Sequence, residues 1–254
     1  MTAAPAWLPP PTELALGPDL VHVWRLPLTQ PPAQLAVLAQ TLGDEERARA
    51  RRFHFDRDRD AYTCARGALR TLAGRYVAQR PDALGFGYRA RGKPYLTAPP
   101  GDSLQFNVSH SGELALLAFT RGREVGVDVE RRRPLQDLRS LAQTSFSPAE
   151  YAALLGVPAH DQTDAFFACW SRKEAFIKAT GEGIGQLAEF DVTVRADEPA
   201  RLLRIPGGAA AGPRWSMRDL PAIPGYAAAL VVDGHEVRIA CWDWPPGGVA
   251  ALPP

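Results

Sequence analysis

Alternating and helically spaced apolar residues predict one strand, three helices and three more strands over the first half of this chain. Val21, Val23 and Leu26 indicate the first strand. Leu69 and Leu72 recur at the spacing of one helix face, which predicts the longest helix of this half. The expected helices are Leu35–Leu42, Asp44–Phe53 and Asp60–Gln79, and the strands that follow are Phe86–Arg89, Leu104–Val108 and Leu114–Phe119.

The second half repeats this order, although no residue-level repeat accompanies it. It begins with a strand at Glu124–Glu130. The expected helices are Leu135–Gln143, Pro148–Leu155 and Thr163–Thr180, and the later strands are Phe190–Val194, Arg201–Ile205, Trp215–Asp219, Tyr226–Val232 and Val237–Trp242. The repeated order predicts an α+β fold, a pseudo-dimer of two similar α+β halves joined near residue 123.

This pattern divides the chain into four parts. A proline-rich leader over residues 1–19 is expected to be loose, because it has no periodic apolar pattern. The N-terminal α+β half covers residues 20–122 and the C-terminal α+β half covers residues 123–244. A tail rich in proline and glycine covers residues 245–254.

Composition and charge narrow the classes of function. The 254 residues are 46% hydrophobic and 22% charged, which is typical of a globular protein and excludes wholesale disorder. A net charge of +1 argues against a dedicated nucleic-acid binder. No apolar run approaches the ~20 residues of a membrane span, and the first residues do not form a secretory signal. Three separated cysteines, Cys64, Cys169 and Cys241, indicate buried thiols, so we expect a soluble cytoplasmic protein.

Two carboxylates share one face of the strand at Glu124–Glu130. Side chains alternate along a strand, so Asp128 and Glu130 lie on one face, while Val125 and Val127 lie on the other. The two acids are roughly 6.5–7 Å apart along the chain, which lets both reach one cation. Oxygen ligands of this kind suit Mg²⁺. Taken alone, the pattern favours an ordinary amphipathic edge strand with two acids in water.

A charged cluster lies on the helix expected over Thr163–Thr180. Glu174 and Lys178 are one turn apart, on a face next to an apolar stripe. In a functional site, Glu174 would be a third carboxylate for the cation, and Lys173 and Lys178 would be directed at phosphate oxygens. On this helix alone, a surface ion pair worth ~0.3–0.5 kcal/mol is favoured.

A third polar cluster, FNVSHSG at Phe106–Gly112, ends an expected strand and offers donors to an anion. Ser109 beside His110 suggests a hydrolase, but adjacent strand residues point to opposite faces and the G-x-S-x-G elbow is missing.

Two further basic segments could meet an anion. Upstream, Lys93 stands in an expected turn. In the segment 47–59, arginines alternate with acids, which by default is a solvated helix face. Only a polyanionic ligand would give a subset of these arginines a function.

Together and in this order, these motifs resemble the 4'-phosphopantetheinyl transferases of the Sfp type. The resemblance covers about residues 20–243 and leaves the leader and the tail aside. The matching segments are GKPYL at Gly92–Leu96, FNVSHSG at Phe106–Gly112, VGVDVE at Val125–Glu130, FSPAEY at Phe146–Tyr151 and FFACWSRKEAFIKATGEGI at Phe166–Ile184, with a weaker match, RARARRFHF, at Arg47–Phe55.

The resemblance implies an active site in the cleft between the two halves, where coenzyme A (CoA) binds together with Mg²⁺, or with Mn²⁺ in its place. It implies an enzyme of the holo-[acyl-carrier-protein] synthase kind. Such an enzyme moves the 4'-phosphopantetheine arm of CoA onto a serine of an apo acyl or peptidyl carrier protein and releases 3',5'-ADP. The expected partners are CoA and the carrier, without nucleic acid or membrane, and the protein is expected to be a monomer.

Residue roles are carried over position by position. The resemblance makes Asp128, Glu130 and Glu174 the Mg²⁺ ligands. Glu174 is the first choice for the base that takes the serine proton, and Glu150 of FSPAEY is the second. The expected catalytic residues are Glu174, Lys178, Asp128 and Glu150. The expected CoA contacts are Arg49, Arg52, Gly92, Lys93, Pro94, Ser109, His110, Lys173 and Lys178, with Lys178 at the pyrophosphate and Arg49 at the 3'-phosphate.

The chain departs from the family pattern in its arginine-rich segment. Glu46 stands where family members often carry a lysine, and the loop around residues 56–60 is slightly longer, which leaves the 3'-phosphate contacts open. Two alternatives remain: a non-catalytic relative that binds CoA or a carrier, and a nucleic-acid surface in the arginine-rich half. The resemblance does not distinguish among the carrier proteins of fatty-acid, polyketide and nonribosomal-peptide systems.

Overall fold

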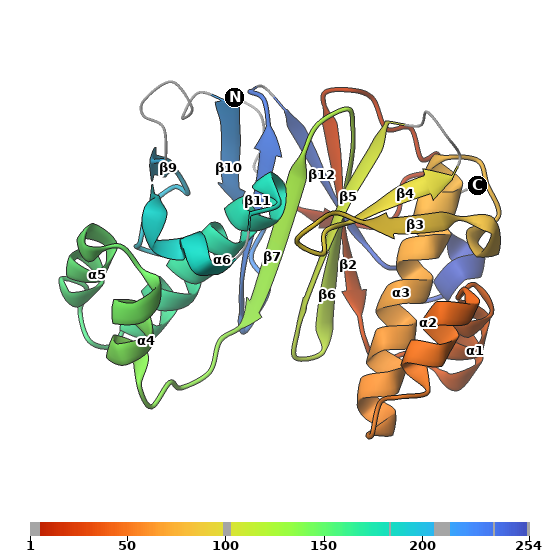
Figure 1. The fold of residues 1–254 in the computed structure, drawn as a ribbon, viewed down its shortest axis with the longest axis horizontal. Helices are drawn as coiled ribbons and strands as arrows, with labels where there is room; N and C mark the ends of the chain where they lie inside the picture. Colours follow the sequence, from red (N-terminus) through yellow and green to blue (C-terminus); the bar gives the residue numbers. More distant parts are fainter. Residues whose placement is uncertain (1–5, 99–102, 183, 206–213, 236, 253–254) are drawn as a thin grey trace.

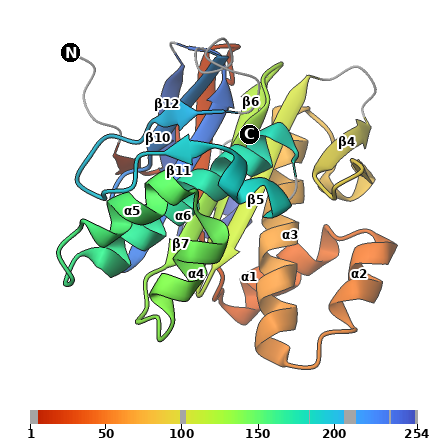
Figure 2. The same cartoon turned by 60° about the vertical axis from the view of Figure 1, so that its left-hand side comes forward.

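Two β-sheets pack face to face, and helices cover the outer face of each (Figures 1 and 2). The computed structural model describes residues 6–98, 103–182, 184–205, 214–235 and 237–252. The strands are β1 (Trp7–Leu8), β2 (Leu20–Pro27), β3 (Gly85–Tyr88), β4 (Pro94–Ala98), β5 (Leu104–Ser111), β6 (Leu114–Arg121), β7 (Val125–Arg131), β8 (Asp191–Val192), β9 (Leu202–Arg204), β10 (Trp215–Asp219), β11 (Tyr226–Asp233) and β12 (Arg238–Asp243). The α-helices are α1 (Pro32–Gln40), α2 (Asp44–Ala50), α3 (Asp56–Tyr76), α4 (Leu138–Ser145), α5 (Pro148–Leu155) and α6 (Gln162–Thr180).

Strand β5 forms one edge of the first sheet, and strand β7 forms one edge of the second. The first sheet has the order β1-β12-β2-β6-β5 and the second has the order β10-β11-β7. Two further pairs, β3 with β4 and β8 with β9, are both antiparallel. Helices and strands follow one another in both halves, and the expected α+β class is confirmed.

Three apolar layers hold these elements together. Helices α1 and α3 pack on the outer face of the first sheet, through buried residues that include Leu38, Leu69 and Phe119. Between the sheets, Val23 of β2 belongs to the same buried cluster as Val127 of β7. The third layer joins the second sheet to α4, α5 and α6, and its buried residues include Phe146, Leu154, Phe166, Phe176 and Val231. Burial of these side chains supplies the main driving force for the fold.

The last strand does not belong to the half in which it was predicted. β12 pairs in parallel with β2 and completes the first sheet, where Cys241 is buried between the two sheets. The tail after it is also packed, because the guanidinium of Arg75 donates to the carbonyl oxygens of Val249 and Leu252 at 3.1 and 3.2 Å. The C-terminal end of the chain therefore stabilises the N-terminal half.

The leader differs from the prediction as well. Trp7–Leu8 pair in parallel with Cys241 and Trp242, so this segment is not loose. The indole N–H of Trp7 donates to the carbonyl oxygen of Pro221 at 3.0 Å, and the guanidinium of Arg25 lies over its ring. Proline content and the missing apolar periodicity suggested a loose segment, whereas an available sheet edge and a tryptophan order it. Within the described residues, no helix combines the length and apolarity that crossing a membrane requires.

Candidate active site

The edge strands β5 and β7 bring the two sheets together at the site. They lie side by side, although they belong to different sheets (Figure 1). Three alternate side chains of β5 accept hydrogen bonds from main-chain amides of β7: Asn107 Oδ1 from Val127 at 2.9 Å, Ser109 Oγ from Val129 at 3.3 Å and Ser111 Oγ from Arg131 at 3.0 Å. The polar residues of FNVSHSG therefore satisfy the exposed edge of β7 and join the two halves.

Gly126 lets helix α6 cross β7 at very short range. A Cβ atom at this position would overlap main-chain atoms of Ala175 and Ala179. Only a glycine leaves room for such a close approach of two backbones. The acidic residues of β7 share the face of Gly126, because side chains alternate along a strand. The crossing thus brings Glu174 and Lys178 of α6 over that acidic face.

Asp128 is the centre of the polar contacts at this crossing. Its buried side chain accepts hydrogen bonds at Oδ1 from Ser109 Oγ at 2.8 Å and from Lys178 Nζ at 2.6 Å. Lys178 also donates to Ser109 Oγ at 2.9 Å. Asp128 Oδ2 is buried and has no hydrogen-bond partner among the described residues. A buried carboxylate oxygen without a partner is costly, so this position suits a bound cation.

Glu174 and Glu130 complete an acidic group around Lys178. Glu174 Oε1 is likewise buried without a partner in the described part of the chain, and Glu130 Oε2 accepts from Ser111 Oγ at 2.9 Å. Burial raises the pKa of Glu174, Lys178 opposes this shift, and Asp128 and Glu130 add to it. Burial and then Asp128 also raise the pKa of Glu130. The three acids therefore carry more negative charge than Lys178 alone can balance.

The donor set of this acidic group fits a hard cation such as Mg²⁺. Asp128 and Glu174 each hold one carboxylate oxygen in the interior without a partner among the described residues, and Mg²⁺ takes only oxygen ligands of this kind. Nowhere in the described ranges are three or more His, Cys, Asp or Glu side chains arranged as a complete metal site. Mg²⁺ usually binds one or two carboxylates and completes its coordination with water and substrate phosphates, so two ligands are sufficient.

A hollow of about 610 Å³ lies on the other face of β5, towards α3. Its lining includes Arg49, Tyr62, Tyr88, Pro94, Val108 and His110. A neighbouring hollow of about 560 Å³ shares Arg49 and adds Arg52. In the described part of the chain these two arginines have no carboxylate partner, whereas Arg47 and Arg59 of the same segment do. The structure therefore separates two arginines that can meet an anion from neighbours that are already paired.

Glu46, the departure from the family pattern, has a structural role beside these hollows. Its buried carboxylate pairs with Arg66 and Arg70 and accepts from the amide of Gly43 at 2.8 Å. Burial would raise the pKa of Glu46, but the nearby arginine charges and the amide lower it overall. Glu46 thus offsets one of the two positive charges that Arg66 and Arg70 bring to the same region.

Two other expected CoA contacts, Gly92 and Lys93, are not among the residues that line either hollow. The ammonium of Lys93 is buried and donates to Glu124 Oε2 at 2.8 Å and to the carbonyl oxygens of Val125 and Ala179, both at 3.0 Å. A lysine has three N–H donors, and all three are used here. The ammonium of Lys93 is therefore already engaged within the protein, and the contact of this segment with CoA stays a prediction.

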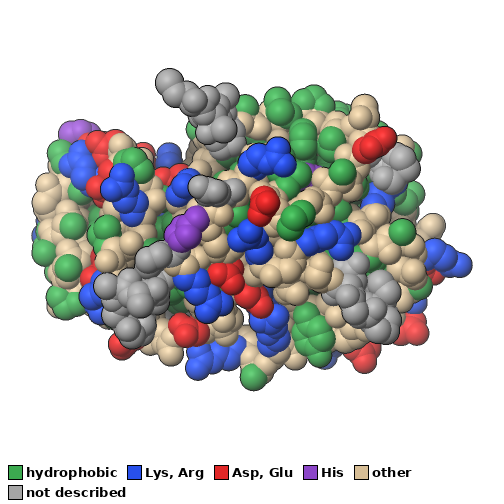
Figure 3. Space-filling model, turned by 90° about the horizontal axis from the view of Figure 1, so that it is seen from above, with side chains coloured by type: hydrophobic (Ala, Val, Ile, Leu, Met, Phe, Trp, Pro, Cys, Tyr) green, Lys and Arg blue, Asp and Glu red, His purple; other side chains and the backbone are tan. Residues whose placement is uncertain are grey.

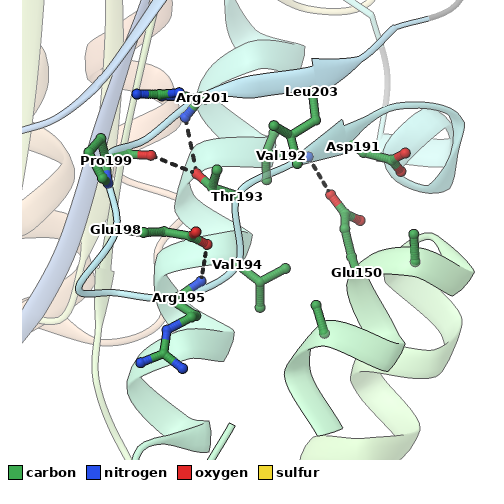
Figure 4. A pocket seen from close by; sticks show the side chains of 12 residues that line it. Glu150, Asp191, Val192, Thr193, Val194, Arg195, Glu198, Pro199, Arg201 and Leu203 are labelled. Carbon is green, nitrogen blue, oxygen red and sulfur yellow. Dashed lines mark hydrogen bonds between the residues drawn. The ribbon is translucent and has the colours of Figure 1, made fainter. Parts of the chain in front are cut away.

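Glu150 and Lys173 form a buried pair on another face of α6, which contradicts the predictions of a base and of a phosphate contact. Lys173 Nζ lies 2.7 Å from both carboxylate oxygens of Glu150 and 2.6 Å from the carbonyl oxygen of Phe190. Glu150 also accepts from the amide of Ser147 at 2.9 Å and from that of Val192 at 2.7 Å, and Figure 4 shows the second of these contacts. Both groups are fully engaged inside the protein, so they neither reach substrate nor exchange protons with it.

The hollow beside Glu150, with a volume of about 630 Å³, does not add a reactive group. Thr193 Oγ donates to the carbonyl oxygen of Pro199 and accepts from the amide of Arg201, and Glu198 accepts from the amide of Arg195 (Figure 4). These polar groups stabilise the loop that follows β8. The candidate reactive groups therefore lie at the crossing of α6 and β7.

Every lysine of this chain belongs to one of these contacts. The sequence has lysine only at positions 93, 173 and 178. Lys93 and Lys173 are buried, and only Lys178 is partly exposed, at 27% of its side chain. The remaining basic side chains are arginines, and from above they are interspersed with acidic and neutral groups (Figure 3). Among the lysines, Lys178 is thus the one that an external phosphate can reach.

Sequence reasoning missed three residues that build the site, Asn107, Ser111 and Gly126. The alternation of side chains along FNVSHSG and VGVDVE could have identified them. Residues 107, 109 and 111 share one face of a strand, and residues 126, 128 and 130 share one face of the next. Applied to every residue of the motifs, the same rule identifies all three as neighbours of the acids.

Both halves of the fold match models of one family of transferases. The 4'-phosphopantetheinyl transferase superfamily matches residues 124–231, and the N-terminal part of 4'-phosphopantetheinyl transferases matches residues 29–121. The chain therefore belongs to the 4'-phosphopantetheinyl transferase family, and the resemblance found in its motifs is confirmed.

Two curated relatives show how far the similarity extends. The chain is 41% identical over 239 residues to the 4'-phosphopantetheinyl transferase HetI of Nostoc sp., covering 94% of this chain and 98% of the relative. It is 31% identical over 157 residues to the 4'-phosphopantetheinyl transferase Sfp of Bacillus subtilis, covering 61% of this chain and 68% of that one. These relatives give no support to a non-catalytic protein of the same fold.

Proposed function

We propose that this protein transfers the 4'-phosphopantetheine arm of CoA to a serine of an apo acyl or peptidyl carrier protein and releases 3',5'-ADP. The observation that carries the proposal is the buried carboxylate of Asp128, held by Lys178 and Ser109 beside Glu174. The family match over both halves supports it. Similarity to Sfp favours an Sfp-like transferase over the narrower holo-[acyl-carrier-protein] synthase.

Mg²⁺, or Mn²⁺ in its place, is the proposed metal. Asp128 and Glu174 would hold it through the two oxygens that lack partners among the described residues, and Glu130 would add charge or a third ligand. When bound, the metal ion would neutralise negative charge on the phosphate oxygens.

Lys178 is proposed to stabilise the same charge from the protein side. Attack on the phosphorus of a diester places negative charge on the non-bridging and leaving oxygens, and a fixed ammonium lowers the energy of that charge. Ser109 donates to Asp128 and accepts from both Lys178 and the amide of Val129, so its hydroxyl fixes the ammonium relative to β7. This arrangement requires little reorganisation when the substrate arrives.

Glu174 is the proposed general base. Without a metal ion, burial raises the pKa of Glu174, whereas a cation held by its carboxylate would lower it. Glu174 would take the proton of the carrier serine directly or through one water molecule. The nucleophile comes from the carrier, so the chain itself needs no activated serine or cysteine.

The two hollows on the α3 side of β5 are the proposed CoA site. His110 and Pro94 line the larger one, and Arg49 and Arg52 supply positive charge for the 3'-phosphate. Desolvation and then the charge of Lys178 lower the pKa of His110, so it would act as a neutral hydrogen-bonding group. We also propose a cytoplasmic monomer without nucleic-acid or membrane partners. The near-zero net charge supports the absence of a nucleic-acid partner, and the three buried free thiols support a cytoplasmic location.

The test is the intact mass of an apo carrier protein after incubation with the protein, CoA and Mg²⁺. A mass increase of one phosphopantetheine group, abolished by a chelator, is the expected result. Asp128→Asn in the same assay separates catalysis at this site from a contaminating activity. If several unrelated carriers gained no mass while CoA still bound, the non-catalytic alternative would replace this proposal.

A further inference from the structure

Lys93 connects the N-terminal half to the place where α6 crosses β7. It immediately precedes β4, yet its ammonium bonds to the carbonyl oxygen of Val125, 32 residues away, and to that of Ala179, 86 residues away. The third acceptor is the carboxylate of Glu124 at 2.8 Å. One side chain from the turn between β3 and β4 thus holds main-chain atoms of both β7 and α6.

The two carbonyl groups belong to the crossing itself. Val125 directly precedes Gly126, the residue over which α6 passes, and Ala179 supplies one of the main-chain atoms that a Cβ at Gly126 would overlap. Ala179 also directly follows Lys178, whose ammonium contacts Asp128. Lys93 therefore bonds to the protein on both sides of the closest approach of helix and strand.

The surroundings of Lys93 are built to keep a charge in the interior. Burial lowers its pKa, and the hydrogen bond to Glu124 opposes that shift. Arg89 lies 2.7 Å from the other carboxylate oxygen of Glu124 and so holds this partner in place. Leaving a buried charge without its partners is strongly unfavourable, so these contacts persist only if the segments keep their relative positions.

We propose, on the basis of the function proposed above, that Lys93 is a positioning residue of the transfer reaction. It holds the C-terminal end of α6 against β7 and so keeps Glu174 and Lys178 at their working distance from Asp128. Hydrogen bonds weaken steeply with distance, and a displacement of ~1 Å at a reacting group is enough to cost about 10²-fold in rate.

The experiment compares Lys93→Met with Arg123→Met. Methionine is close to lysine in length but cannot donate, so the first variant leaves the three acceptors without the ammonium. Arg123 is a matched control, because it also joins distant segments through three acceptors, the carbonyls of Pro18 and Asp233 and the carboxylate of Asp19. None of these acceptors belongs to α6.

Three quantities are measured for each variant: hydrogen exchange of a peptide covering residues 174–182, the kcat of carrier modification, and the Kd for CoA without metal. For Lys93→Met we expect exchange at the end of α6 to be at least about tenfold faster and kcat to fall about 10²-fold, with the Kd for CoA within about twofold. Arg123→Met should leave all three near wild type, even if it lowers the melting temperature.

Two results would overturn the inference. A Kd for CoA about tenfold higher with unchanged exchange at α6 would make Lys93 a ligand contact. Equal changes in both variants would make it a general stabilising residue. If Lys93→Met does not fold, Glu124→Gln replaces it, with the same pattern on a smaller scale. An inactive wild-type protein would end the proposed function, whereas exchange at α6 would still decide whether Lys93 positions the helix.

Discussion

The ammonium of Lys178 lies 2.6 Å from the carboxylate of Asp128, although 50 positions separate the two residues in the chain. The contact depends on Gly126, because only a residue without a side chain lets α6 pass so close to β7. It also depends on Ser109 from the other sheet, whose hydroxyl contacts both charged groups. One ion pair thus combines a helix, two edge strands and both halves of the molecule.

Asp128→Asn should reduce the rate of carrier modification by about 10²–10³-fold or more, because the change removes the charge that holds Lys178 and one proposed metal ligand at nearly constant size. Initial rates at saturating CoA measure this effect, together with the melting temperature. Asp243→Asn is the control, since it loses only the ion pair with Arg25 on the first sheet. A wild-type rate for Asp128→Asn at ordinary Mg²⁺ would remove Asp128 from the metal site.

Gly126→Ala should lower both stability and activity. The added methyl group would overlap main-chain atoms of α6, so the helix must move away from β7, at a cost of roughly 1–3 kcal/mol or more. Urea unfolding measures the loss of stability, and the transfer rate reports the displacement of Lys178. Gly17→Ala is the matched control, because nothing lies within 4 Å of the corresponding Cβ. Equal stability of the two variants would mean that the close crossing does not persist in solution.

Lys173→Met should destabilise the protein by about 3–5 kcal/mol, because it leaves the buried carboxylate of Glu150 without its cation. The free energy of unfolding from urea titration measures this loss. Replacing both residues by methionine should recover much of the lost stability, since the unpaired charge is then removed as well.

Glu150→Gln should keep the pH profile of the transfer rate in the folded protein. Loss of the acidic limb of that profile would instead restore Glu150 as the base, because a general base is inactive once it is protonated.

Stability should fall when the pH drops below about 6.5, because His22 accepts a proton less readily in the folded state than in the unfolded state. The indole N–H of Trp24 donates to the hydroxyl oxygen of Tyr76, so the hydroxyl hydrogen is available to His22 Nδ1, 2.7 Å away. Burial lowers the pKa of His22 to about 4. A group whose pKa is lower in the folded state than in the unfolded state favours unfolding as the pH falls between the two values.

The expected loss from His22 amounts to about 3 kcal/mol between pH 6.5 and pH 4. Urea unfolding at pH 7, 6 and 5 gives the pH dependence, and His22→Gln should make it flatter because glutamine does not titrate. An identical pH dependence in wild type and variant would assign the loss to other groups.

Local signals predicted single elements well, whereas pairings between distant segments could not be read from the sequence. The bounds of α5 agree with the prediction because Ser147 and Glu150 form a capping box that fixes where the helix begins. β4 was missed, since its first residue is Pro94 and the segment resembled a turn. The pairing of β12 with β2 depends on contacts between opposite ends of the chain, which no local pattern contains.

For the site as well, local patterns identified individual residues, whereas contacts between distant segments could not be predicted. Asp128, Glu174 and Lys178 were identified because alternation and helical spacing place them on specific faces. Lys93 was assigned to CoA by the resemblance and Lys173 to phosphate oxygens by its place on the helix, whereas their ammonium groups bond to carbonyls and carboxylates of remote segments. For Glu150 the capping box was visible in the sequence and already indicated a structural role.

The distribution of lysine has a practical consequence for handling this protein. Reagents that attack primary amines, such as succinimide esters, have only Lys178 as a partly exposed lysine target, because Lys93 and Lys173 are buried. Random dye labelling or attachment to a sensor surface through lysine would therefore modify the group that faces Asp128. Conjugation to another chemical group preserves this ammonium, and a single amine-directed adduct at Lys178, blocked by CoA, would turn the same chemistry into a probe of site occupancy.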